Sequence, residues 1–188
     1  MRKIIFIITT VIIFVTLNVL IYKKEMTLKE GKTVFLDLAP TDPRSLIQGD
    51  YMILRYRLSQ EIAMLKPKNS GYVVLNELEK DLDSSNVEPR QGPAAYLQLA
   101  SGRIKGLVPV RLYDGEVLTK NEYLLKYHYR NNRVQISAGK TDAYFFQEGH
   151  AKYYERARYG FIKLAKSGEA VLYKLYDNKF KVIEPLEK

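Results

Sequence analysis

The feature that most constrains this chain is an apolar segment near its start. Residues 4–22 are nineteen residues without a charged side chain. At 1.5 Å per residue a helix of that length spans about 28 Å, which is enough to cross the hydrocarbon core of a bilayer. The sequence therefore predicts a membrane anchor over residues 1–24, a polar juxtamembrane linker over residues 25–32 and one domain over residues 33–188.

A cleaved signal peptide is the alternative interpretation of this segment, because Arg2 and Lys3 form a short basic start. However, residues 18–22 offer no pair of small residues for cleavage, and the chain has no cysteine for lipid attachment. We therefore favour an uncleaved single-pass signal anchor, with the lipid bilayer as the first expected partner.

The charges that flank the apolar segment do not by themselves determine on which side of the membrane the domain lies. Arg2 and Lys3 precede the segment, whereas residues 23–32 contain four lysines. Counted literally, the positive-inside rule places the domain in the cytoplasm. Long domains are translocated largely regardless of charge, however, and a short basic N-terminus is the usual start of a secretory anchor. We expect an extracytoplasmic domain and keep the cytoplasmic one as the alternative.

Charge and aromatic content argue against nucleic acid as a partner. The chain has 30 basic and 21 acidic residues; leaving out the four basic residues that flank the apolar segment gives 26 against 21, and they are spread out. Tyrosines alternate with basic residues over 127–133, as in a stacking surface for single strands. The same alternation is typical of a strand with tyrosines facing a core, and we favour this interpretation.

Alternating apolar residues predict a β-rich α+β fold, mainly antiparallel, with one or two short helices. A hairpin is predicted across Asn131 and Asn132, because asparagine tolerates the positive φ of a tight turn. The main helix is predicted at 148–157, a helical turn at 61–65 and a polar loop at 79–93. Strands are predicted at 33–38, 51–58, 71–75, 95–99, 107–112, 123–130, 133–137, 143–146, 161–164, 170–176 and 179–183.

Several kinds of chemistry are excluded by composition. The absence of cysteine removes thiol catalysis and cysteine–zinc sites, and His128 and His150 are the only imidazoles. No phosphate-binding glycine loop and no serine-hydrolase elbow occurs in the sequence. We therefore expect no metal and no cofactor.

The segment from Asp42 to Asp50 predicts a rigid corner. Asp42 can cap its own turn, Pro43 presets the next φ angle, and Gly49 adopts backbone angles that other residues resist. Arg44 can then fork to Asp42 or to Asp50. Two interpretations stay open: the corner is purely structural, or it presents Arg44 to an anion or a partner protein.

A second candidate constellation lies where a predicted strand ends and the predicted helix begins. Glu148 and Gly149 occupy this point. The Glu148 carboxylate would either pair with Arg44 across the fold or stabilise the start of the helix, where the helix dipole favours negative charge.

These residues resemble the signature of the GDYXXLXY family of bacterial membrane-anchored proteins. The match consists of Gly49, Asp50, Tyr51, Leu54 and Tyr56, preceded by Asp42, Pro43 and Arg44, and of Phe145, Glu148 and Gly149 in a later Phe-x-x-Glu-Gly segment. The resemblance implies an extracytoplasmic domain without an established activity. We therefore expect a non-enzymatic binding or accessory domain that serves a multi-pass envelope membrane protein.

The alternative function is a hydrolase. Residues 41–51 also resemble the nucleophile segment of type I signal peptidases, Ser-Met-x-Pro-Thr-Leu-x-x-Gly-Asp. Thr41 stands at the position of the nucleophilic serine, and Arg44 stands where that segment has proline. Threonine needs a neighbouring base to act as a nucleophile, and Lys105 is the candidate base. This interpretation predicts a signal-peptidase-like serine/threonine hydrolase with a degenerate nucleophile segment.

Overall fold

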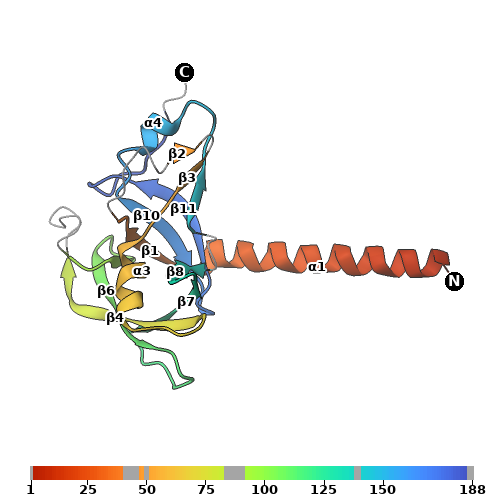
Figure 1. Cartoon of the computed structure of the whole chain (residues 1–188), viewed down its shortest axis with the longest axis horizontal. Coiled ribbons are helices and arrows are strands. Elements are labelled where there is room, and N and C mark those ends of the chain that lie inside the picture. The colour runs from red at the N-terminus through yellow and green to blue at the C-terminus, as the bar shows by residue number, and fades with distance from the viewer. Residues whose placement is uncertain (1, 40–46, 49–50, 83–91, 138–140, 186–188) are drawn as a thin grey trace.

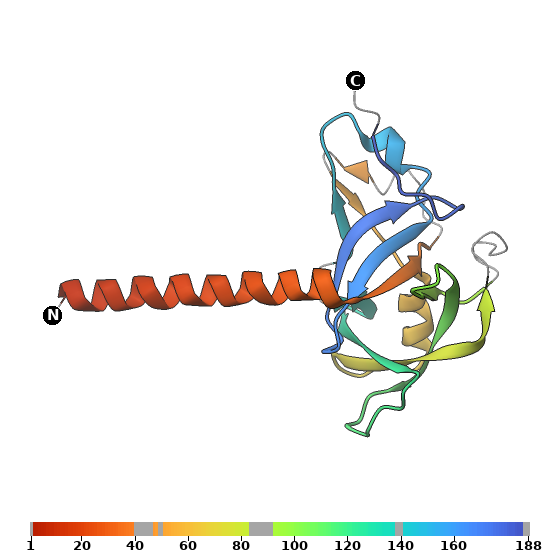
Figure 2. The same ribbon diagram turned by 180° about the vertical axis from the view of Figure 1, so that it is seen from behind.

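The computed structural model of the chain describes residues 2–39, 47–48, 51–82, 92–137 and 141–185. It confirms the predicted architecture: an N-terminal apolar helix is followed by an antiparallel β domain with few short helices. Figure 1 shows the first helix, α1, projecting as one straight rod from the β domain, and Figure 2 shows the same arrangement from behind.

Helix α1 covers Arg2–Glu30. By length and composition it can cross a membrane, and its apolar part is exposed in the isolated chain. The predicted linker over residues 25–32 is thus mostly a continuation of this helix. Gly31 alone separates α1 from the first strand; its backbone N–H donates to the carbonyl oxygen of Thr27 at 3.0 Å. A Cβ at Gly31 would lie 2.3 Å from that oxygen, so the junction requires glycine.

The larger sheet of the described residues has eight strands in the order β11-β10-β1-β5-β6-β4-β7-β8, and the smaller has three in the order β2-β3-β9. All of these strand pairs are antiparallel. The strands are β1 (Lys32–Asp37), β2 (Ile47–Gln48), β3 (Tyr51–Ile53), β4 (Gly71–Leu82), β5 (Ala95–Gln98), β6 (Ile104–Leu112), β7 (Glu122–Arg130), β8 (Arg133–Ile136), β9 (Ala143–Phe145), β10 (Tyr159–Leu164) and β11 (Ala170–Tyr176).

The predicted strand over residues 51–58 is wrong beyond Ile53, because helix α3 begins at Arg57 and ends at Met64. Its Leu58 and Ile62 are fully buried, one helical turn apart. Helix α3 contacts β1, β6 and β8, which are well separated in the strand order, so the large sheet curves around it. Figure 1 shows α3 beside the strands of the large sheet, near the labels of β1, β6 and β8.

Strand β4 is longer than the strand predicted at 71–75 and extends into the loop predicted at 79–93. Two other predicted elements are shorter in the structure. The helix predicted at 148–157 is reduced to α4, Ala151–Tyr154, because Gly149 takes a positive φ of +79° just before it. The strand predicted at 179–183 is reduced to a single bridge between Tyr176 and Val182. The hairpin across Asn131 and Asn132 is confirmed, with φ angles of +50° and +61° that match a tight primed turn.

Strand β1 is buried on both faces. Val34 and Leu36 face the main core, which also contains Leu58, Ile62 and Leu125. The other face carries Phe35, which belongs to a second cluster that is mainly aromatic. The chain therefore passes directly from the exposed helix α1 into the strand that lies between β10 and β5 within the large sheet.

Candidate functional site

The predicted corner falls largely outside the described residues. Asp42, Pro43, Arg44, Gly49 and Asp50 all lie there, so the pairing of Arg44 with its neighbours stays a prediction. Thr41, the threonine of the hydrolase interpretation, lies there too. The described part of the signature is Tyr51, Leu54 and Tyr56.

The two parts of the family resemblance meet in the small sheet. Tyr51 of β3 pairs in register with Phe145 of β9, and their ring centroids are 5.7 Å apart. Phe145 is 75% exposed, so this aromatic pair borders solvent. Glu148 and Gly149 follow β9 at exposed positions before α4. The pairing of Glu148 with Arg44 stays a prediction, whereas Tyr51 and Phe145 join the two segments within the small sheet.

Leu54 and Tyr56 fix the signature segment to the core. Both are buried, and the backbone N–H of Leu54 donates to the carbonyl oxygen of Asp142 at 2.7 Å. The hydroxyl of Tyr56 donates to the carbonyl oxygen of Thr141 at 2.5 Å. The Tyr56 ring also packs on Gly160, where a Cβ would lie 2.9 Å from it. The role of these two signature residues in the described structure is therefore to hold a wall of the domain in place.

The residue after Tyr56 forms an ion pair that the sequence analysis did not identify. Arg57, the first residue of α3, donates from Nη1 to Oδ2 of Asp37 at 2.8 Å. Its Nη2 donates to the carbonyl oxygen of Gly92 at 2.7 Å and lies 3.6 Å from Glu61. Asp37 is 1% exposed, so this pair is largely desolvated. In the sequence, only the i, i+4 spacing of Arg57 and Glu61 indicated that Arg57 takes part in an ion pair.

Two tyrosines lie near the same carboxylate. Tyr96 and Tyr159 are fully buried, and within the described residues their hydroxyls have no hydrogen-bond partner. Burial, followed by the charge of Asp37, raises the pKa of Tyr96 to about 12. Burial also raises the pKa of Tyr159, together with Tyr96 and Asp37. Both phenols therefore stay neutral, and the two tyrosines contribute ring packing beside the ion pair.

A pocket of about 380 Å³ opens beside the signature segment. It is lined by Leu54, Arg55 and Tyr56 of the signature segment, by residues of α3, by Arg133 of β8 and by Asp142. We call this space the signature pocket.

Asp142 is the acidic group that lines the signature pocket, and its pKa is raised. Burial raises its pKa from 3.8 to about 6, although hydrogen bonds from Thr141 and from the backbone of Ile136 oppose the shift. The Thr141 hydroxyl lies 3.3 Å from the Asp142 carboxylate. A carboxylate in this state changes its charge near neutral pH, which is a property common at binding sites.

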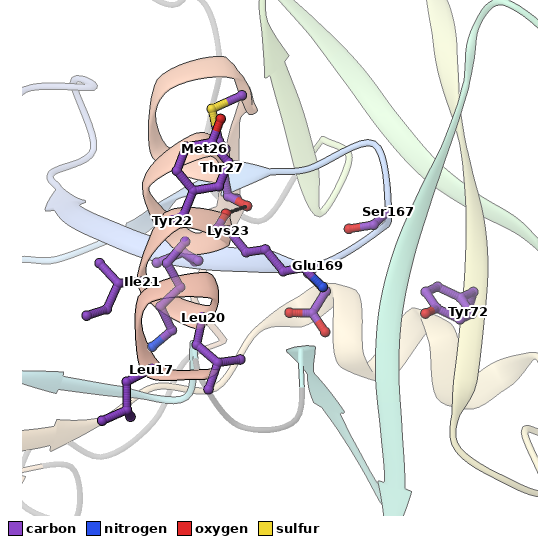
Figure 3. Close-up of a pocket in the computed structure, with 12 residues that line it drawn as sticks. Leu17, Leu20, Ile21, Tyr22, Lys23, Met26, Thr27, Tyr72, Ser167 and Glu169 are labelled. Atoms are coloured by element: carbon purple, nitrogen blue, oxygen red, sulfur yellow. Dashed lines mark hydrogen bonds between the residues drawn. The ribbon is translucent and has the colours of Figure 1, made fainter. Parts of the chain in front are cut away.

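A second concavity of about 830 Å³ lies where α1 meets the domain. Figure 3 shows Leu17, Leu20 and Ile21 of α1 on one side, with Ser167 and Glu169 of the domain nearby and Tyr72 beyond. We call this space the junction groove. Its α1 side is mostly apolar, and Lys23 and Lys24 also line it.

Lys105, the candidate base of the hydrolase interpretation, has a structural explanation. Its Nζ lies 3.1 Å from Oε2 of Glu77, which links β6 to β4. The other oxygen of Glu77 accepts a hydrogen bond from the Tyr123 hydroxyl. Among the described residues, no cluster of histidine, aspartate and glutamate has the arrangement of a metal site.

These features define a class: an antiparallel β domain, carried directly on an apolar helix, whose signature segment forms the wall of a pocket. The chain belongs to the GDYXXLXY protein family, whose model matches residues 13–175 and so covers α1 from its middle and nearly all of the β domain. No curated protein and no solved structure gives a significant match.

The raised pKa of Asp142 predicts a specific dependence of stability on pH. The folded state binds this proton more tightly than the unfolded state, so the contribution of Asp142 is most favourable below about pH 4. It is lost as the pH rises through about 6. Because the side chain is partly exposed, we expect the loss to be about 1–2 kcal/mol. Asp142→Asn should therefore be more stable than the wild type at pH 7 but not at pH 4.

The measurement is urea unfolding of the full chain in detergent between pH 4 and pH 8. Asp114→Asn is the matched control at an exposed position, because Asp114 is 60% exposed. A constant difference between Asp142→Asn and wild type across this range would contradict the assignment.

Proposed function

We propose that this chain is a membrane-anchored, non-enzymatic accessory domain that binds an envelope membrane protein, as its subunit or partner. The observation that carries the proposal is the junction at Gly31. A helix long and apolar enough to span a bilayer continues, without a flexible linker, into an interior strand of the main sheet. A domain attached in this way has a fixed height and orientation above the lipid, which suits a subunit better than a freely diffusing enzyme.

The dimensions of the helix support a position close to the bilayer surface. Residues 23–30 continue α1 beyond the uncharged segment by about 12 Å. The headgroup region on each side of the hydrocarbon core is about 5–8 Å thick, so α1 ends just beyond it. Tyr22 and the lysines that follow it are residue types that anchor a helix at this level. The β domain would therefore rest on the headgroups.

The junction groove is the surface that we assign to the partner. Leu17, Leu20 and Ile21 would lie at the outer part of the hydrocarbon, and Ser167 and Glu169 directly above it. A multi-pass protein presents the same sequence of surfaces, with an apolar helix below and a polar loop above. It would fill both parts of the groove in one contact, whereas a soluble protein would reach only the upper part.

The partner assignment predicts the outcome of photo-cross-linking in native membranes. A benzophenone amino acid at Ser167, in the junction groove, should give a discrete adduct with an integral membrane protein. The same probe at Val117, which is 93% exposed and not part of the groove, should not. The adduct should remain in the membrane after a carbonate wash. Equal adducts at both positions, or none at Ser167, would contradict the assignment.

The proposed anchoring and side predict a second result. The full-length chain should remain in the carbonate-resistant fraction at its full mass, and alkaline phosphatase fused after Lys188 should be active, because the domain is proposed to lie outside the cytoplasm. Recovery of a shortened, soluble species would contradict the anchor. If the phosphatase fusion is inactive and a fluorescent protein fused at the same position emits, the domain lies in the cytoplasm.

A further inference from the structure

The signature pocket combines three kinds of surface in one small space. Its volume of about 380 Å³ lies at the lower end of the range for small-molecule sites. Asp142 supplies a partly buried carboxylate, whereas Arg55 and Arg133 supply exposed guanidinium groups. The pocket therefore offers an acidic group and two basic groups to one ligand.

Apolar side chains occupy the space between these charges. Leu54 and Val134 are buried at the pocket wall, and Ala63 of α3 also lines it. Ile53 adds a side chain that is 41% exposed. A ligand that filled the pocket would thus need an apolar body as well as charged groups of both signs.

The protein supplies the Asp142 carboxylate with hydrogen bonds but with no opposite charge among the described residues. Asp142 accepts a long hydrogen bond of 3.3 Å from Thr141 and one from the backbone of Ile136. Within the described residues, no basic side chain forms an ion pair with it. An ammonium group would supply the missing opposite charge, and burial at this position would strengthen the interaction.

We propose that the signature pocket binds a small zwitterion with an apolar side chain, namely an α-amino acid or a dipeptide. The ligand ammonium pairs with Asp142, its carboxylate reaches Arg55 and Arg133, and its side chain lies on Leu54 and Val134. The arrangement gives the family signature a direct role, because Leu54 and Tyr56 hold the wall that the ligand contacts. This site is separate from the junction groove and does not depend on the proposed partner.

The proposal also predicts a dependence of binding on pH. The other titratable or charged groups that line the pocket are the guanidinium groups of Arg55 and Arg133 and the Tyr56 phenol, which burial keeps neutral. Asp142 is the group that changes charge, and an ammonium requires its ionised form. Affinity should therefore fall about tenfold per pH unit below pH 6.

The test is calorimetric titration of the full-length chain in detergent with L-leucyl-L-leucine at pH 7.5. We expect binding that Asp142→Asn weakens at least tenfold, since the charged hydrogen bond is lost, and that Arg133→Gln also weakens. Arg130→Gln is the matched control, because Arg130 is an exposed residue of the neighbouring strand that does not line the pocket. It should bind as the wild type does.

A second probe distinguishes the proposed contacts from a loss of folding. N-acetyl-L-leucyl-L-leucine lacks the ammonium and should bind the wild type at least tenfold more weakly. The proposal is overturned if leucyl-leucine does not bind at millimolar concentration, if the acetylated dipeptide binds equally well, or if Asp142→Asn retains the affinity and the pH dependence of the wild type.

Discussion

The ion pair between Asp37 and Arg57 is the interaction on which the arrangement of the domain depends. Asp37 ends β1 and is almost fully buried, and Arg57 begins α3. The two arms of the guanidinium reach a carboxylate and the Gly92 carbonyl, so one side chain joins three segments that are distant in sequence. Because a buried charge that loses its partner is strongly destabilising, this pair fixes where α3 starts.

The start of α3 in turn determines the signature segment. Tyr56 precedes Arg57 directly, and its buried ring and hydroxyl hold the chain between Gly160 and Thr141. Leu54 lies two residues before Tyr56, and its backbone N–H donates a hydrogen bond to the carbonyl oxygen of Asp142. The wall of the signature pocket is therefore a consequence of core packing. Strand β1 carries α1 at one end and Asp37 at the other, so it connects the apolar helix mechanically to this wall.

The sequence predicted the parts of the fold that depend on local patterns. The uncharged run indicated α1, and the Asn131–Asn132 pair indicated its hairpin because the turn chemistry is local. The alternation of apolar residues over 51–58 was misleading. Those residues are indeed buried, but the chain changes from strand to helix within the run, and Leu58 belongs to a helical pair with Ile62. The spacing of apolar residues alone does not show at which residue a strand changes into a helix.

The pair of Asp37 with Arg57 could not be predicted in the same way. The partners lie twenty residues apart, and Asp37 looked like an interruption of an apolar strand. Asp142 likewise carried no local signal, since its raised pKa comes from burial in the folded domain. The predicted corner around Arg44 remains a prediction. The described residues of the family signature, Tyr51, Leu54 and Tyr56, act through packing.

The most direct test of this account is a double-mutant cycle on the ion pair. Asp37→Asn, Arg57→Gln and the double variant of the full-length chain would be compared with the wild type by urea unfolding. We expect each single change to lower the free energy of unfolding by about 3–5 kcal/mol. The double variant should lose clearly less than the sum, with a coupling of about 2 kcal/mol or more. Additive losses, with a coupling below about 0.5 kcal/mol, would show that the pair does not hold the domain together.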